Sequence, residues 1–359
     1  MKVRWHGFAF AFMAFTFGGL AANPSPALAG DCACRTKCGC GDGSGQWIDK
    51  YGDGTEAPAG DMADNQFDLG EGAPAQTGSS FVALDAAGAY IDSAIVASRF
   101  RLRADAAYNN PRPDRVEFFY AECGILGGRG PQQIERNVDY QEIVPYFEWA
   151  TSDKFSVFVE TPIRFINPEV NPNTGGISDV NAGFKYAFIA DQDEYLTAQF
   201  RVYTPTGLPA RGLGTGHVSL EPSILYFRRF TDRLIFQAEI RDWIPISDSQ
   251  VGTQDFAGNV LRYGMGFGYD LIQNYDCCCE QTSKLTAVGE FVGWTIMDGL
   301  AFNGFTGNLE DQTGVTIVNA KAGLRYVNGP HSFYGGYGQG LTNQVWYQDI
   351  LRFEYVRAF

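Results

Sequence analysis

The chain has 359 residues, a formal net charge of −14, and 45% hydrophobic and 14% aromatic residues. So acidic a protein lacks the basic patches that nucleic acid requires, which excludes nucleic acid as a partner. After the N-terminal region no stretch approaches about 18 uninterrupted apolar residues, so the sequence predicts no transmembrane helix. The 43 glycines and the many aromatic residues instead favour short alternating strands.

Residues 1–29 have the features of a secretion signal. Lys2 and Arg4 precede an apolar run over residues 8–22, and Ala27-Leu28-Ala29 supplies the small residues of a cleavage site. The apolar run is too short to span a bilayer, which disfavours the alternative of an uncleaved anchor. We therefore expect an exported protein of a Gram-negative-type envelope.

Residues 30–78 are rich in Gly, Asp, Ala and Cys and show no periodicity, so we interpret them as a flexible periplasmic leader. In an oxidising compartment its cysteines favour disulfides, and their spacing is not that of a zinc ribbon. Four thiolates holding a metal is the alternative, but we predict no metal site and no cofactor. The pairing is not readable from sequence. The disulfide candidates are Cys32, Cys34, Cys38 and Cys40 of the leader and Cys277, Cys278 and Cys279 of a predicted periplasmic turn.

From about Ser98 the sequence alternates between apolar and polar residues. This period of two predicts strands with one apolar and one polar face. About twelve strands are expected, over residues 99–106, 140–149, 157–165, 179–188, 196–202, 221–226, 236–241, 261–270, 286–296, 318–326, 332–341 and 351–359. A further hairpin at 111–120, with residues 81–96 as the partner strand, would raise the number to fourteen.

The connections between these strands alternate in length. Residues 152–153, 191–193 and 231–232 are short joins, whereas 167–176, 206–216 and 247–257 are long ones. Outer-membrane barrels have short periplasmic turns and long outer loops. The sequence therefore predicts an all-β fold, a transmembrane antiparallel up-and-down β-barrel within residues 79–359, with the leader and the C-terminus in the periplasm. A soluble β-sandwich is disfavoured because aromatic residues gather near the strand ends.

His217 and Ser219 share one face of a predicted strand and are the only catalytic-looking pair. A 12-stranded outer-membrane phospholipase uses a similar pair, but no Asn precedes His217 and no Gly follows Ser219. We expect both side chains to point into the barrel, away from lipid. The prediction is that the protein is not an enzyme, with a phospholipase as the remote alternative.

The last strand, residues 351–359, ends in an aromatic residue and resembles the assembly signal of outer-membrane proteins. Phe353, Tyr355 and Phe359 are its aromatic residues. The expected partners are therefore the barrel-assembly machinery, through this strand, and the lipids of the outer membrane.

Seventeen charged residues occupy positions opposite the apolar ones and are expected to line the lumen. Such charges either line a polar pore or form a salt-bridged filling. We favour a channel or transporter for small polar or amphipathic solutes of unknown identity, and keep a structural barrel with a plugged lumen as the alternative. The lumen-lining residues are Arg101, Arg103, Asp105, Glu142, Glu160, Arg164, Lys185, Arg201, Glu221, Glu239, Arg241, Arg262, Glu290, Lys321, Arg325, Arg352 and Glu354.

Four short motifs in the middle of the chain suggest a family. Residues 175–186 (GGISDVNAGFKY), 203–207 (YTPTG), 212–216 (GLGTG) and 220–222 (LEP) resemble strands and turns of an outer-membrane family named for the meta-pathway of phenol degradation. The resemblance covers about residues 138–359 and implies an outer-membrane barrel, often labelled a transporter. It implies no particular solute, because the motifs belong to strands and turns.

Overall fold

The computed structural model describes residues 84–359 apart from 247–249, 252–253, 276–280 and 304–305. The predicted signal sequence, the leader with Cys32, Cys34, Cys38 and Cys40, and the run Cys277–Cys279 lie outside the described residues. No helix in the described part of the chain is long and apolar enough to cross a membrane.

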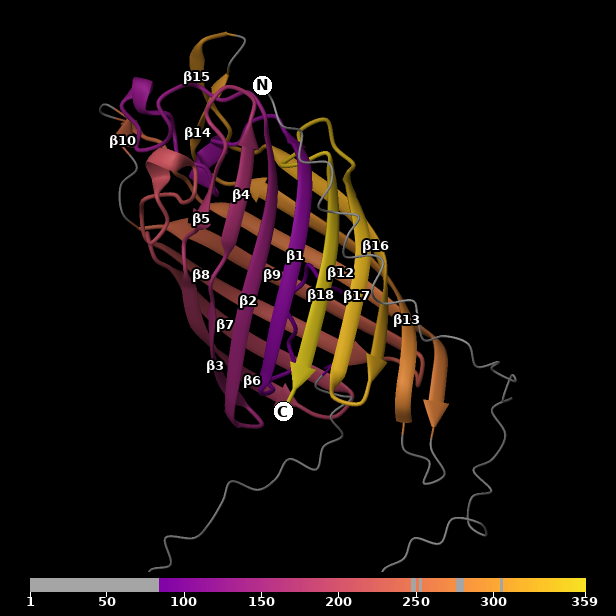
Figure 1. Cartoon of the computed structure of the whole chain (residues 1–359). Helices are drawn as coiled ribbons and strands as arrows, with labels where there is room; N and C mark the ends of the chain where they lie inside the picture. The colour runs from indigo at the N-terminus through magenta and orange to yellow at the C-terminus, as the bar shows by residue number, and fades with distance from the viewer. Residues whose placement is uncertain (1–83, 247–249, 252–253, 276–280, 304–305) are drawn as a thin grey trace, which may run out of the picture. The chain divides into compact units, whose positions relative to one another are not determined.

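Twelve antiparallel strands form a closed barrel (Figure 1). Fourteen hydrogen-bonded segments make twelve wall strands, because β3 and β4 continue one another along β2, and β5 and β6 continue one another along the next position. β18 pairs with β1 from Arg99↔Ala358 to Tyr108↔Asp349 and closes the sheet. The wall segments are β1 (Arg99–Asn110), β2 (Val138–Ser152), β3 (Phe155–Glu160), β4 (Ile163–Pro168), β5 (Thr174–Ile177), β6 (Asn181–Ala190), β7 (Glu194–Tyr203), β8 (Ser219–Arg229), β9 (Leu234–Pro245), β12 (Val260–Tyr275), β13 (Gln281–Ile296), β16 (Thr316–Asn328), β17 (His331–Gly340) and β18 (Asp349–Ala358).

The prediction of twelve strands is confirmed, and the fourteen-strand alternative is wrong. Residues 111–137, which we call the cap loop, contain only the 3-10 turns η2 (Arg115–Glu117) and η3 (Gly124–Leu126). Pro111 and Pro113 have no N–H group for a ladder, and Val116 and Glu117 have positive φ angles of 48° and 53°, which extended backbone does not allow. Residues 84–96 form no strand either, because β1 already pairs on both edges.

The two ends of the barrel differ. Short connections at 153–154, 191–193, 230–233 and 329–330 lie at what we call the turn end. The connections at 111–137, 169–173, 204–218, 297–315 and 341–348 lie at the loop end, which also carries η4 (Pro209–Arg211) and the small hairpins β10 (Gln250–Val251)–β11 (Gln254–Asp255) and β14 (Leu300–Asn303)–β15 (Asn308–Asp311). In Figure 1 the loop end is at the top.

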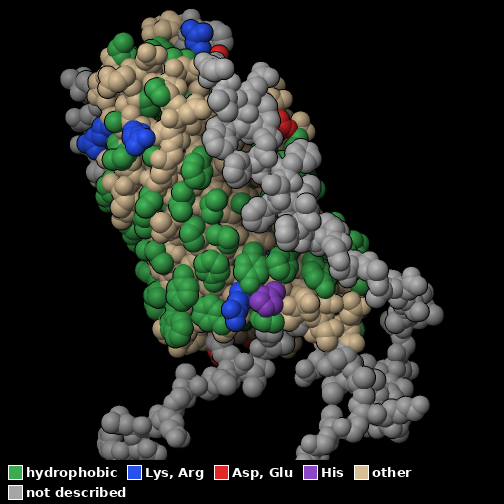
Figure 2. Space-filling view, in the orientation of Figure 1, with side chains coloured by type: hydrophobic (Ala, Val, Ile, Leu, Met, Phe, Trp, Pro, Cys, Tyr) green, Lys and Arg blue, Asp and Glu red, His purple; other side chains and the backbone are tan. Residues whose placement is uncertain are grey.

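Polarity is reversed relative to a soluble protein, with apolar side chains outside and charged ones inside. Trp149, Phe291 and Leu324 are 51%, 52% and 50% exposed, whereas Glu290 and Arg325 are 1% and 2% exposed. Figure 2 shows hydrophobic side chains gathered over the strands of one face, with few charged groups among them. Since the strand period is two, every outward apolar residue places its neighbour's side chain in the interior.

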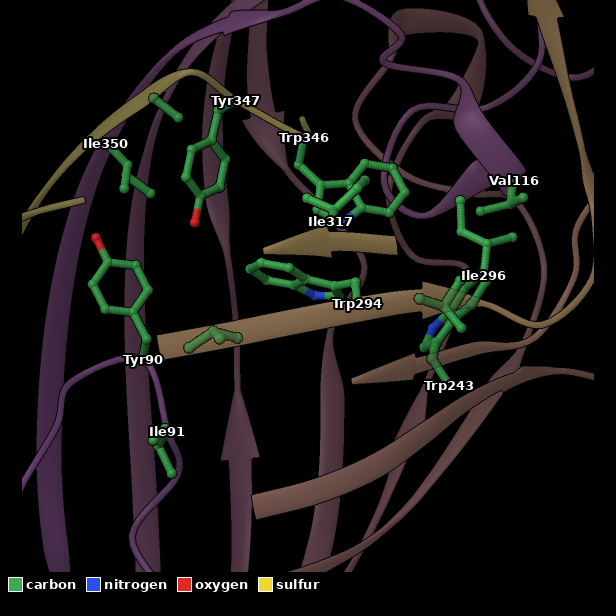
Figure 3. Packing of buried hydrophobic residues seen from close by; sticks show 13 residues of the cluster. Tyr90, Ile91, Val116, Trp243, Trp294, Ile296, Ile317, Trp346, Tyr347 and Ile350 are labelled. Atoms are coloured by element: carbon green, nitrogen blue, oxygen red, sulfur yellow. The ribbon is translucent and has the colours of Figure 1, made fainter. Parts of the chain in front are cut away.

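Residues 84–97, which we call the lumen segment, lie inside the barrel. The segment starts at the turn end, where Leu84 clusters with Val327. It reaches towards the loop end at Tyr90 and Ile91, which cluster with Trp294 (Figure 3), and returns to the turn end, where Ile95 clusters with Phe227. The lumen therefore holds two passes of polypeptide before the chain enters β1.

Candidate functional site

All seventeen predicted lumen residues have inward side chains. Thirteen of them are buried, and only Arg101, Arg103, Arg164 and Arg262 are partly exposed. Most of them form ion pairs, largely between neighbouring strands. Arg103 and Arg164 both contact Glu142, at 2.9 and 2.5 Å. Such pairs satisfy charges that are costly to bury alone.

Several of the lumen charges also hold the lumen segment through its backbone. One carboxylate oxygen of Glu290 accepts hydrogen bonds from the N–H groups of Ala89, Tyr90 and Ile91, at 3.1, 3.1 and 3.2 Å. Carbonyl oxygens of the segment accept hydrogen bonds from wall side chains in return. These pairs are Arg325 to Gly88 (2.8 Å), Arg352 to Ala89 (2.6 Å), Lys185 to Ser93 (3.1 Å), Thr197 to Ala94 (2.6 Å), Arg262 to Tyr90 and Arg99 to Ile95.

Two carboxylates of the lumen segment pair with wall cations. Asp92 lies 2.7 Å from Arg201 and 3.1 Å from Arg241, and Asp85 pairs with Arg229 and Lys284. Within the described residues, no backbone-to-backbone hydrogen bond joins residues 84–97 to a wall strand. The segment is thus attached by side chains rather than by a β-ladder.

The ring of Tyr90 lies between two cations. The Nζ atom of Lys321 is 3.1 Å from the ring centroid, and the guanidinium carbon of Arg352 is 3.5 Å from it. Figure 3 shows Tyr90 inside the barrel, below Tyr347 and Ile350. Cation–π contacts of this kind strengthen when water is excluded.

Sequence reasoning missed several members of this site. Arg99 and Glu148 continue the period of two along β1 and β2, so extending that pattern by one step finds them. Lys284 lies in β13 ahead of residue 286, where the predicted strand begins. Asp85 and Asp92 carry no such signal, because the lumen segment has no period.

The cap loop closes part of the loop end. Phe118 stacks on Trp346 at a centroid distance of 5.1 Å and meets Trp243 edge-on at 5.7 Å. Burial raises the pKa of Glu122 to about 9 and that of Asp114 to about 6, and their carboxyl groups hydrogen-bond each other. The cap loop therefore contains carboxyl groups whose protonated forms are favoured.

His217 and Ser219 contact each other at the base of the cap loop. Ser219 Oγ lies 3.2 Å from His217 Nδ1, and His217 Nε2 lies 3.3 Å from Glu117 Oε2. All three residues are at most 1% exposed, inside the barrel. A lipid held at the outer surface does not reach Ser219 in this arrangement, and the contacts join the cap loop to β8.

Three of the four family-like motifs meet at the loop end. Asp179 accepts hydrogen bonds from the N–H groups of Gly207 (3.0 Å) and Thr215 (2.7 Å). A Cβ atom at Gly214 would lie 2.3 Å from Asp179 Oδ1, so this close approach requires glycine. These contacts order a loop, and Lys185 of the first motif also reaches the lumen segment, where it donates to the carbonyl of Ser93.

Two cavities among the described residues are small. One of about 40 Å³ lies beside the lumen segment and is lined by Asp92, Arg101 and Lys185 among others. Another of about 180 Å³ lies at the loop end between Tyr120, Asn171 and Arg211. Among the described residues there is no group of His, Cys, Asp and Glu that could hold a metal ion.

Comparison with known proteins supplies no family. No family model and no curated protein matches the sequence. Among solved structures, an outer membrane channel from Pseudomonas putida F1 is similar with a TM-score of 0.47 and 12% identity, over 76% of this chain and 98% of that one. The NanC porin is similar with a TM-score of 0.39 and 12% identity, over 72% of this chain and 98% of that one. The KdgM porin has a TM-score of 0.38 and 9% identity, over 73% of this chain and 99% of that one. Likeness this distant carries no argument about activity, and the resemblance to the phenol-pathway family stays a prediction.

Proposed function

We propose that this chain is an outer-membrane channel for small polar or amphipathic solutes, and that the lumen segment closes it. The observation that carries the proposal is the double pass of residues 84–97 through the barrel. A lumen wide enough for two passes of polypeptide is wide enough for a small solute once the segment withdraws. The attachment by side chains alone favours a segment that can leave without breaking the sheet.

The membrane location is supported by the outward apolar side chains. A band of exposed Phe, Tyr, Leu, Ile and Val surrounding a charged interior matches a lipid-facing barrel. By the same rule we propose that the short turns face the periplasm, and with them the end of β18, which lies at the turn end. We propose lipids and the barrel-assembly machinery as its partners.

A conductance measurement on matched variants tests the gate. Glu290→Gln weakens the hydrogen bonds from three N–H groups of the lumen segment. Glu142→Gln is the control, because Glu142 is also an inward carboxylate but pairs with Arg103 and Arg164 of the wall. Hydrogen bonds to a charged group contribute about 1.5–3 kcal/mol, so the open state should gain about tenfold or more in E290Q. Single-channel recording in planar bilayers should show brief openings in wild type, frequent ones in E290Q and wild-type behaviour in E142Q.

A second candidate is a structural barrel with a permanently plugged lumen. The dense pairing of lumen charges favours it, because such pairs also make a rigid filling. Under this candidate, wild type and E290Q are both silent while remaining folded. Equal opening of E290Q and E142Q would instead indicate general loosening of the barrel, and would also contradict the gate.

Catalysis is not part of the proposal. The phospholipase alternative requires lipid hydrolysis that is lost in Ser219→Ala. We expect no hydrolysis in either protein, because Ser219 is buried on the inward face of β8.

A further inference from the structure

We propose that the lumen contains a built site for small carboxylate anions, and that Asp92 of the lumen segment occupies this site in the closed state. Such anions are then the solute class that competes with Asp92. This last step rests on the proposed channel function, since the solute must reach the site when the segment leaves. The existence of the site does not depend on conduction.

The site has four donors around one carboxylate. Asp92 Oδ2 lies 2.7 Å from Arg201 Nη2, 3.1 Å from Arg241 Nη2 and 3.2 Å from Gln199 Nε2. Asp92 Oδ1 lies 3.6 Å from Arg101 Nη1. Guanidinium groups offer planar, charge-assisted donors that match a carboxylate.

All four donors belong to the wall and not to the lumen segment. They project from β1, β7 and β9, and wall carboxylates hold them in place. Arg101 is 2.9 Å from Glu160, and Arg241 is 2.9 Å from Glu221. The guanidinium groups therefore stay directed into the lumen after Asp92 has left.

The local charge leaves room for one anion. Four arginines surround the site, namely Arg101, Arg201, Arg241 and Arg262, and three wall carboxylates pair with them, namely Glu160, Glu221 and Glu239. One positive charge remains, and Asp92 balances it. An unbalanced charge in a partly dehydrated interior is costly, so a vacated site recruits a monoanion.

The Asp92 side chain is itself a model of the ligand, because its CH₂–COO⁻ group corresponds to acetate. Its side chain is also more exposed than those of its two nearest cations, at 13% against 6% for Arg201 and 2% for Arg241. A solute entering beside a displaced lumen segment meets the donors from the side that Asp92 now covers.

Chemical rescue by acetate tests the site without any current. The full chain, purified from membranes in detergent, is heated in acetate or in chloride at equal ionic strength, and the loss of the compact gel band is followed. In Asp92→Ala, acetate should raise the melting temperature by about 2–4 °C relative to chloride. Wild type, whose site is filled, should show no such shift.

Two controls locate the effect. Ser93→Ala changes a neighbouring residue of the lumen segment whose hydroxyl accepts a hydrogen bond from Ile95, so it should behave as wild type. Adding Arg201→Gln to Asp92→Ala should abolish the acetate shift. If Asp92→Ala does not assemble, Asp92→Ser takes its place with the same expectations.

The remaining outcomes contradict either the anion site or the channel function on which its solute role rests. A folded Asp92→Ala with no acetate-specific shift overturns the site. An equal or larger shift with inorganic phosphate overturns its assignment to carboxylates. Silent bilayers alongside a clear acetate shift would reject the channel and leave the anion site standing, so the two failures are distinguishable.

Discussion

Individual charges in this barrel are buried together with several partners. Glu148, with no exposed surface, accepts from Arg99 (2.9 Å), Lys185 (3.1 Å), Ser156 (2.7 Å) and Tyr146 (2.8 Å). Four donors on one carboxylate replace the water that it loses on burial. The same principle explains why Glu290 accepts three backbone N–H groups.

At the residue scale, the cap loop should loosen as the pH rises. Glu122 has a pKa of about 9 in the folded cap loop, raised by burial from 4.5, so the folded state holds a proton that the open loop releases. The contribution of this proton to the stability of the folded cap loop is fully present below about pH 4.5 and is lost as the pH rises through about 9. Hydrogen exchange of residues 111–137, corrected for intrinsic rates, should rise by about tenfold or more between pH 6 and 9.

Two variants check this assignment. Glu122→Gln keeps a neutral side chain at every pH, so its exchange should be nearly independent of pH. Glu169→Gln changes an exposed carboxylate on a neighbouring loop and should leave the wild-type profile intact. If hydrogen exchange of the wild-type cap loop did not depend on pH, the role of Glu122 would be refuted.

At the scale of elements, the seam between β18 and β1 completes the barrel. The N–H group of Phe359 donates to the carbonyl of Ser98 at 3.1 Å, just beyond the Arg99↔Ala358 pair. Its ring stacks on Phe147 of β2 at 5.7 Å, across β1. The last residue thus joins β18 to β1 and β2, the two strands at the other end of the barrel sequence.

Phe359→Ser should therefore reduce the amount of assembled protein while leaving export intact. Phe188→Ser is the matched control, because Phe188 is equally exposed, at 57%, on β6 and away from the seam. Quantifying the compact and heat-denatured bands in outer-membrane fractions should show a loss of several-fold for F359S and little for F188S. Equal assembly of the two variants would exclude an assembly signal at the C-terminus.

At the scale of the molecule, the reversed polarity is the dominant feature. An apolar exterior and a charged interior are stable only where lipid surrounds the wall. The lumen segment then replaces the water that an open lumen would contain.

We accordingly expect the protein in the outer membrane, with a gel mobility that changes on boiling. Protease added to intact cells should cleave the connections of the loop end, and a C-terminal epitope should react only after permeabilisation. Recovery as a soluble periplasmic protein would contradict the membrane proposal. Reaction of the C-terminal epitope on intact cells would contradict only the orientation.

The barrel was predictable from sequence because its strands are specified locally. A period of two assigns each side chain to one face or the other wherever the strand is placed. Phe147, Trp149 and Phe353 are exposed for this reason, whereas Lys185, Arg201 and Arg325 are buried. The alternation of short and long connections likewise favoured a barrel over other all-β folds.

The occupant of the lumen was decided only by tertiary structure. Residues 84–97 have no periodicity, and their main contacts cross about 200 positions, as from Ala89, Tyr90 and Ile91 to Glu290. The same segment was read as a candidate strand, because composition does not show that β1 and β18 already close the sheet. Sequence by itself determined the strands of the wall and the sign of the charges that they carry. Barrel closure decided which of these charges contact the lumen segment, because only closure brings strands that are distant in sequence around one interior.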